Sequence, residues 1–326
     1  MSFVDEVPSL SVTLGHGGLK RTRMEFSIII ATYDRVELLR RLLTGIRKHF
    51  GASHVQHEVI VANNARADAI ARAIDATVGE FQRQGGAALR LVREPMAGKC
   101  RAQNTAMREA RGDIFAFFDD DVEVTPEWLK IAAEFFRREP FDAMQGPILV
   151  PPHLEHDTRF LQAQRRFRTI NFVQYSPQLK EIKTLTGANM AMRRELLAKV
   201  GGFNEKLGPG RSGISEDVEF AQRVLRSGGR IGYEHRAAVY HEVDWSRLTE
   251  EFFRLRHEQQ GRSRLIYKKQ SLASIVPNLL RSLSTLGWHS LFGDVREQYR
   301  AKGRFFHYRA MLVQKIKSAS GNQAEP

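Results

Sequence analysis

Short apolar runs and longer amphipathic segments alternate along the first half of the chain. Four runs have the length and the β-branched or aromatic character of buried strands: 26–31, 57–65, 89–94 and 113–121. The segments that follow them repeat apolar residues at helical spacing and cover 36–50, 68–84, 99–110 and 125–139. This alternation predicts an α/β fold in which helices flank a mostly parallel sheet.

The rhythm changes after Met144. The sequence predicts a strand over 143–152, a helix over 159–168, a strand, turn and helix over 181–203, a helix over 215–229 and a strand over 230–243. Two hydroxyl side chains, Thr125 and Ser215, are expected to cap the helices that follow them. Ligands of parallel sheets bind at the carboxyl ends of the strands, so function is expected there.

Composition narrows the class of protein. The chain has 326 residues, of which 42% are hydrophobic and 27% charged, as in soluble globular domains. Its single cysteine, Cys100, excludes a disulfide framework and is typical of a reducing compartment. We find no leader pattern at the start and no run that approaches the roughly 18 apolar residues of a membrane span. These features predict a cytoplasmic protein.

Positive charge is concentrated toward the C-terminus. The net charge is +13, and from Trp245 onward there are 15 Lys and Arg residues but only 6 Asp and Glu residues. The same region carries apolar residues at helical spacing over 271–292, with basic residues around them. Such a segment suits the cytoplasmic surface of an anionic membrane, and it equally suits packing on the protein. A phosphorylated substrate and nucleic acid are the other polyanions that such a basic segment could bind.

Three consecutive aspartates end the fourth predicted strand. Asp119, Asp120 and Asp121 repel one another unless a cation or hydrogen bonds compensate their charges. Oxygen ligands of this kind bind Mg²⁺ or Mn²⁺, and Mg²⁺ is usually held together with substrate phosphates. A solvated turn, in which the carboxylates accept backbone hydrogen bonds, is the alternative for an isolated triplet.

The triplet is one of several motifs that follow one another in order. They are SIIIATYDR, IVANNARAD, EPMAGKCRAQ, IFAFFDDD, TGANMAMRRELLAKVGGF, SEDVEF and VYHEV. Together they resemble the glycosyltransferase family 2 enzymes over roughly residues 25 to 245. The resemblance implies a GT-A fold and inverting, metal-dependent transfer of a sugar from a nucleotide donor. We therefore expect a catalytic domain 25–245 with a nucleotide-sugar half 25–125 and an acceptor half 126–245. The residues themselves predict a poorly ordered segment 1–24, which has no helical or strand period, and a basic, amphipathic helical extension 246–326.

The resemblance assigns residues to the sugar donor. It implies that the nucleotide base lies against a first-strand turn formed by Ala31, Thr32 and Tyr33. Lys99 and Arg101 belong to a donor-site segment, and Asn63 matches a position where the family often has an Asp that reads the base. The amide of Asn63 both donates and accepts hydrogen bonds, unlike a carboxylate, so the residue does not determine which nucleotide base is bound. Among nucleotide-diphosphate sugars, we expect a UDP-sugar first.

The aspartate triplet matches the DxD motif of the family. The resemblance implies that Asp121 binds Mn²⁺ or Mg²⁺, that Asp119 lies between the metal and the ribose, and that Asp120 lies beside the donor. The metal would bridge the diphosphate and offset the charge that grows on the leaving group. His241 matches a position near the metal, although a histidine at a strand end is more commonly a hydrogen-bonded residue.

Asp217 matches the catalytic base of the family. The resemblance implies that it takes the proton of the acceptor hydroxyl during attack on the anomeric carbon, and that Glu216 orients the acceptor. Acidic residues at the start of a helix are also expected from the helix dipole alone. An acceptor-side turn is expected at Gly187, Ala188 and Asn189. A glycan or a lipid-linked molecule is the expected acceptor.

Other functions fit the sequence less well. Processive members of the family carry Gln-x-x-Arg-Trp, and here Ser263 stands in place of the Trp after Gln259 and Arg262, which favours transfer of one sugar over a polysaccharide synthase. A sugar-nucleotide pyrophosphorylase is disfavoured because no Gly-rich basic loop follows the first strand. A nucleic-acid-binding protein is disfavoured because no known module is present, despite the basic charge.

Overall fold

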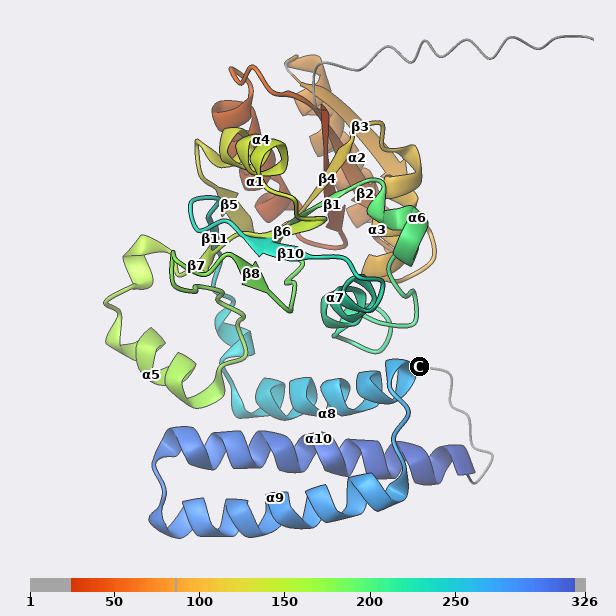
Figure 1. Ribbon diagram of the computed structural model, residues 1–326. Helices are drawn as coiled ribbons and strands as arrows, with labels where there is room; N and C mark the ends of the chain where they lie inside the picture. Colours follow the sequence, from red (N-terminus) through yellow and green to blue (C-terminus); the bar gives the residue numbers. More distant parts are fainter. Residues whose placement is uncertain (1–24, 86, 320–326) are drawn as a thin grey trace, which may run out of the picture.

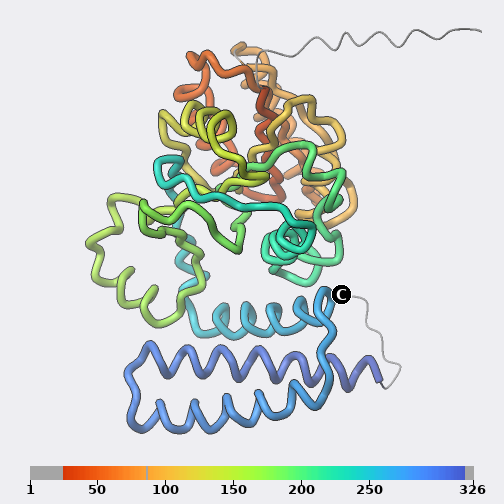
Figure 2. Tube along the Cα trace, viewed as in Figure 1, coloured from red at the N-terminus to blue at the C-terminus, as the bar shows by residue number. Residues whose placement is uncertain are grey.

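The structure, a computed structural model, describes residues 25–85 and 87–319 (Figure 1). The segment 1–24, for which we expect poor order, lies outside the described residues. The described chain forms a layered α/β body, and three long helices follow it, as the trace in Figure 2 shows. This is the α/β fold with a C-terminal helical extension that the sequence predicts.

The central sheet has eight strands in the order β3-β2-β1-β4-β9-β6-β10-β8. Four of the strands are neighbours and run parallel: β3 (Ala88–Arg93), β2 (Gln56–Asn63), β1 (Glu25–Thr32) and β4 (Ile114–Asp119). The other four are β9 (Asn189–Arg193), β6 (Ala143–Gln145), β10 (Ile231–Tyr233) and β8 (Glu181–Ile182). Because β9 is antiparallel to both β4 and β6, the sheet is mixed, with its longest strands parallel.

Helices cover both faces of this sheet. On one face lie α1 (Val36–Phe50), α2 (Asp68–Arg83) and α4 (Trp128–Arg138). On the other lie α3 (Lys99–Glu109), α6 (Leu196–Val200) and α7 (Glu216–Arg226). Side chains alternate along β4, so Ile114 and Phe118 enter the first core whereas Phe115 and Phe117 enter the second. A strand buried on both faces needs the continuous apolar run that the sequence has there.

A second, three-stranded sheet continues from the end of β4. It consists of β5 (Val122–Val124), β11 (Val239–His241) and β7 (Ile148–Leu149). In the antiparallel register of β5 and β11, His241 lies opposite Val122, and the Glu242 amide donates to the Asp121 carbonyl at 2.8 Å. The small sheet therefore brings His241 beside the aspartate triplet.

Two segments expected to be single strands are each divided. The segment 230–243 forms β10 and β11 in different sheets, because a turn closed by Ala237 N–H donating to Glu234 O interrupts the strand between them. In the same way 143–152 forms β6 and β7.

The two predicted caps are wrong. Helix α4 begins at Trp128, and Thr125 Oγ1 instead donates to Ala238 O at 2.9 Å. Ser215 does precede α7, but it has φ 81° and its hydroxyl makes no capping bond to the helix. In both places tertiary contacts outweigh the local preference for a cap.

The C-terminal helices form a layer beneath the α/β body. They are α8 (Glu250–Tyr267), α9 (Leu272–Phe292) and α10 (Val295–Ala319), and α10 lies between the other two (Figure 1). Two short 3₁₀ helices, η1 (Pro152–Leu154) and η2 (Trp245–Arg247), and the helix α5 (Thr158–Phe167) complete the described elements. None of the helices in 25–85 and 87–319 combines the length and the apolar character that crossing a bilayer requires.

Candidate active site

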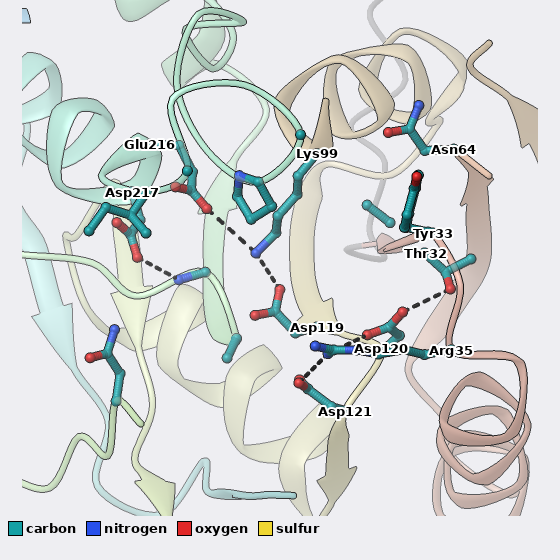
Figure 3. A pocket seen from close by; sticks show the side chains of 18 of the residues that line it. Thr32, Tyr33, Arg35, Asn64, Lys99, Asp119, Asp120, Asp121, Glu216 and Asp217 are labelled. Atoms are coloured by element: carbon teal, nitrogen blue, oxygen red, sulfur yellow. Dashed lines mark hydrogen bonds and ion pairs between the residues drawn. The ribbon is translucent and has the colours of Figure 1, made fainter. Parts of the chain in front are cut away.

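A pocket of about 510 Å³ opens at the carboxyl ends of β1 and β4. Its walls come from the first residues of α3 and α7, the turn at 186–188 and the loop at 209–215. Asp119, Lys99 and Glu216 converge on its centre (Figure 3). Its size is in the range that holds a small-molecule ligand, and its place in the sheet is where such ligands bind.

Lys99 is the cation that joins the two sides of the pocket. Its Nζ lies 2.5 Å from Asp119 Oδ1 at the end of β4 and 3.6 Å from Glu216 Oε1 at the start of α7 (Figure 3). Burial alone lowers the pKa of Lys99, but the two carboxylates outweigh burial and raise it. At Asp119 burial is outweighed by Lys99, which lowers the pKa of that carboxyl. At Glu216 burial prevails over the attraction of Lys99 and raises the pKa to about 7.

Arg35 is the second cation among these carboxylates. It precedes α1, and its guanidinium contacts Asp120 Oδ1 at 3.3 Å and also pairs with Asp121 Oδ2. Thr32 Oγ1 donates to the other oxygen of Asp120 at 2.8 Å. Burial and the charge of Asp121 nevertheless raise the pKa of Asp120 to about 7. The triplet is therefore a hydrogen-bonded, largely buried cluster and not a solvated turn.

Asp119, Asp121 and His241 form a group that fits a divalent cation. One ligand atom from each lies within 4.8 Å of the others. Arg35 and Arg247 both contact Asp121 Oδ2, whereas Asp121 Oδ1 is buried and accepts no hydrogen bond from any described residue. His241 Nδ1 faces Glu242 O at 2.6 Å, which places the ring proton there and leaves Nε2, 3.5 Å from Asp121 Oδ1, free to bind a metal.

Asp217 lies across the pocket from this group, in the first turn of α7. Its Oδ2 accepts from Gly187 N–H at 3.2 Å and its Oδ1 from Val218 N–H at 2.7 Å. Burial raises the pKa of Asp217, against the attraction of Lys99 and the two backbone donors. A carboxylate so held keeps free lone pairs on the pocket side, as a general base requires.

Most of the residues selected from the sequence line this pocket. They are Ala31, Thr32, Tyr33, Lys99, Asp119, Asp120, Asp121, Glu216, Asp217 and His241. Of the expected acceptor-side turn, Gly187 and Ala188 also line it. Asn189 does not: it is fully buried, where it accepts from Trp128 Nε1 and donates to Pro147 O and Ala237 O, each at 2.8 Å.

Asn63 and Arg101 do not line the pocket. The Asn63 side chain turns to α2, where Nδ2 donates to Ala71 O at 3.0 Å and to Asp75 Oδ1 at 2.9 Å. Its neighbour Asn64 lines the pocket instead, held by Gly98 N–H donating to Oδ1 at 3.0 Å (Figure 3). Arg101 points toward Glu205, 3.5 Å away. Neighbouring side chains alternate in direction along a strand, so a shift of one residue exchanges their surroundings.

Sequence reasoning missed several pocket residues. Arg35 is the last residue of the ATYDR stretch, and its position just after the first strand was the signal available. Asn64 was one residue from the position selected. Arg247 and Arg256 come from η2 and α8, beyond the end of the expected catalytic domain at 245, and nothing local in the sequence indicated them.

Comparison with known proteins identifies the fold and the family. The family model described as Glycosyl transferase family 2 matches residues 27–201, more than half of the chain. The succinoglycan biosynthesis protein ExoM of Rhizobium meliloti is 28% identical over 254 residues, 76% of each chain. The glucosyl-dolichyl phosphate glucuronosyltransferase of Haloferax volcanii is 22% identical over 161 residues, which are 48% of this chain. This chain spans about half of that relative, 51% of its length.

Solved structures confirm the predicted GT-A fold. A mannosyltransferase from Pyrobaculum calidifontis, in complex with GDP-Man and Mn²⁺, superposes with a TM-score of 0.59 at 17% identity and covers 93% of this chain and 89% of its own. S. aureus TarS 1–349 in complex with UDP-GlcNAc gives a TM-score of 0.53 at 16% identity and covers 93% of each chain.

Replacing Lys99 by Met should destabilise the protein in a pH-dependent way. The change leaves Asp119 and Glu216 without their buried cation, which costs about 3–5 kcal/mol when both are ionised. The unpaired carboxyls then bind protons more tightly in the folded than in the unfolded state. The loss should therefore be largest at pH 8 and shrink as the pH falls toward 5.

Urea unfolding in EDTA measures this loss. Lys180→Met, at an exposed position, is the matched control and should change the free energy of unfolding by less than about 0.5 kcal/mol. A Lys99→Met deficit that is absent, or equal at pH 5 and pH 8, would show that Lys99 does not compensate these carboxylates.

Proposed function

The chain belongs to glycosyl transferase family 2, with residues 27–201 as its glycosyltransferase domain, and on that premise we propose an inverting, metal-dependent transfer of one sugar. The sugar comes from a nucleotide-diphosphate donor and goes to a hydroxyl of the acceptor. One observation carries the proposal: a single pocket holds a metal-type cluster on one wall and a carboxylate, Asp217, on the opposite wall. An inverting displacement needs these two groups on opposite sides of the anomeric carbon.

The donor lies, in this proposal, along the ends of β1 and β4. Tyr33, which is 48% exposed at the pocket wall, and Asn64 on the same wall offer a ring and an amide to the nucleotide base. Asn64 thus takes the role first expected of Asn63. The structural neighbours described above include complexes with GDP-Man and with UDP-GlcNAc, which supports a nucleotide sugar without selecting the base.

Asp119, Asp121 and His241 would hold the divalent cation, Mn²⁺ or Mg²⁺. A bound cation supplies positive charge to the donor diphosphate as negative charge grows on the leaving group. Lys99 lies on the same side, with its Nζ between Asp119 and Glu216. In this proposal Lys99 favours the ionised form of Asp119, and the chain's own cations, Lys99 and Arg35, hold the carboxylates in place.

Asp217 acts as the base in this proposal. It must be ionised to take the proton of the acceptor hydroxyl, and Lys99 favours that form while burial opposes it. The Gly187 amide, which donates to Asp217 Oδ2 at 3.2 Å, fixes the orientation of the carboxylate. Glu216, paired with Lys99, lies beside it and orients the acceptor.

The acceptor enters, in this proposal, from the side of the pocket lined by Arg247 and Arg256. The catalytic domain then extends past residue 245 to include the first part of α8. Ser263, where processive members carry Trp, is fully buried and its Oγ lies 2.8 Å from Ser212 Oγ, so no ring stacks there. This supports one-sugar transfer. The names of the Haloferax and Rhizobium relatives point to lipid-linked and polysaccharide acceptors, and we propose an acceptor of that kind.

Asp217→Asn tests the proposed chemistry. The amide has nearly the size of the carboxylate but cannot take a proton at neutral pH, so turnover should fall by at least about 10²-fold. Nucleotide affinity should change little, because the donor is held on the opposite wall. Turnover is measured as release of nucleoside diphosphate from a panel of UDP- and GDP-sugars, and affinity by calorimetry.

Asp68→Asn is the matched control, since Asp68 lies in the first turn of α2 and outside the pocket. It should leave turnover unchanged. Near-normal turnover in Asp217→Asn would mean that this carboxylate serves only the helix dipole, and a parallel loss of nucleotide affinity would make it part of the donor site.

We also propose that α9 lies on an anionic membrane. Leu272, Val276, Leu280, Leu283 and Leu291 form one stripe along the helix, and each is between 38% and 77% exposed. Trp288 and Phe292 extend this apolar surface and are 63% and 70% exposed. The excess of basic residues beyond Trp245 complements an anionic surface, which supports a membrane as the partner of this stripe.

Leu280→Gln combined with Leu291→Gln should weaken binding to vesicles that contain anionic lipid. Each leucine that loses membrane contact costs part of the roughly 1.5–3 kcal/mol of a buried side chain, so affinity should fall at least about tenfold. Co-sedimentation measures the binding. The control pair, Leu161→Gln with Leu179→Gln, changes apolar residues that are 48% and 39% exposed elsewhere and should have no effect. Equal binding of the α9 variant and the wild type contradicts the proposal.

A further inference from the structure

A second cavity of about 430 Å³ lies between α5, α8 and α10. Helix α8 separates it from the candidate active site. The stripe of Phe253, His257, Gln260 and Arg264 lines the second cavity, whereas the neighbouring stripe at Arg256 lines the active site. The chain from α5 does the same, since 166–168 line the second cavity and 169–171 the first. The two cavities thus share a wall but not a side chain.

The second cavity is strongly basic. Six arginines line it: Arg166, Arg168, Arg264, Arg296, Arg300 and Arg304. No Asp or Glu is among its lining residues in the part of the chain that the structure describes. Arg300 pairs with Glu297 at 2.9 Å, and the other five have no carboxylate of the described residues within 4.0 Å. The nearby Glu250 is taken by Tyr299, whose hydroxyl donates to it at 2.7 Å, and by Lys302.

Like charges collected without partners repel one another and create a positive potential that attracts anions. The cavity is therefore suited to an anion, and the described residues place no carboxylate in its lining. His307 also lines the cavity, and its Nδ1 is buried without a hydrogen-bond partner among the described residues. A multiply charged anion would compensate the charge of the arginines.

The walls of the cavity are firmly packed. Phe167, Phe253 and Tyr299 contact one another edge to face or tilted, with ring centroids 5.3–6.3 Å apart, and the Arg166 guanidinium lies over Tyr299 at 5.7 Å. At Gly303 an added Cβ would come within 2.6 Å of the His257 ring, so α8 and α10 meet closely there. Arginines on such a support are preorganised for an anion.

We propose that this cavity is a binding site for a multiply charged phosphate group, separate from the site of sugar transfer. The guanidinium fork matches two phosphate oxygens at once, and arginine holds its charge at any physiological pH. Arg296, Arg300 and Arg304 are four residues apart and form one row along α10. Arg166, Arg168 and Arg264 line the rest of the cavity. Together the six arginines carry more positive charge than a phosphate monoester can neutralise, so a diphosphate suits the cavity best.

Two sources present this chemistry. One is a soluble phosphate compound, and the other is the phosphate of a lipid head group. The position of the cavity is compatible with both sources. Arg296 lines the cavity, and the exposed Trp288 and Phe292 of α9 lie a few residues before it in the chain, so a lipid head group could reach the cavity as well as a soluble compound. The experiment separates the two.

Inorganic pyrophosphate is the probe for the soluble source. Binding is measured by calorimetry in EDTA, because the carboxylates of the active site repel the probe when no divalent cation is present. The test variant is Arg296→Gln combined with Arg304→Gln, both exposed and unpaired with any described carboxylate. The control, Lys269→Gln with Arg281→Gln, removes the same charge from the same C-terminal region outside the cavity. Thermal unfolding checks that both remain folded.

The wild type and the control should bind pyrophosphate alike, and the test variant at least about tenfold more weakly, since it loses two charged hydrogen-bond donors to the phosphate. If the wild type binds no soluble probe, the lipid source is tested with phosphatidylcholine vesicles with and without phosphatidic acid. The same loss in the test variant alone then assigns the site to a lipid phosphate. Three results would overturn the proposal: an equal loss of affinity in the test and control variants, a test variant that binds as tightly as the wild type, or a wild type that binds neither probe.

Discussion

Compensation of buried negative charge is the constraint on which the active-site region depends. Asp119, Asp120 and Asp121 end one strand, and Glu216 and Asp217 begin a helix that packs on the same pocket. Carboxylates brought together in a low dielectric destabilise the fold unless cations or donors face them. Lys99 joins the two groups, Arg35 binds Asp120 and Asp121, and backbone amides hold Asp217. One oxygen, Asp121 Oδ1, stays without a hydrogen-bond partner among the described residues, and His241 faces it.

The fold supplies these groups from distant parts of the chain. Parallel pairing of β1 with β4 places Ala31 opposite Asp119, and antiparallel pairing of β11 with β5 brings His241 alongside. Glycine at 98, with φ 139°, lets the chain turn into α3 so that Lys99 starts the helix inside the pocket. Helix α8 then closes the pocket with Arg256 on one face and lines a basic cavity with another. Acidic and basic sites thus lie on the two sides of one helix.

The regular half of the fold could be predicted from the sequence, because its strands are continuous apolar runs and its helices have a clear period. The range 36–50 agrees with α1, and Asp119 to Asp121 fall at the end of β4 as expected. The short strands after Met144 could not be predicted in this way, because a turn at Glu234 divides the segment 230–243, which looks like one continuous strand in the sequence. The site was found where motifs follow strand ends directly. Single residues of the site were missed for two reasons. A shift of one residue decides which side chain faces the pocket, as at Asn63 and Asn64, and a helix distant in the sequence supplies Arg256.

Titration with Mn²⁺ shows whether one divalent cation completes the charge of this cluster. Metal-free wild type, Asp121→Asn and Asp217→Asn are titrated with Mn²⁺ by calorimetry at pH 7, with UDP and with GDP. Both variants remove one carboxylate charge from the same pocket, but only Asp121 belongs to the group with Asp119 and His241. We expect one saturable Mn²⁺ site in the wild type and in Asp217→Asn, and its loss in Asp121→Asn. Equal binding by all three, or no saturable binding in the wild type with either nucleotide, would contradict it.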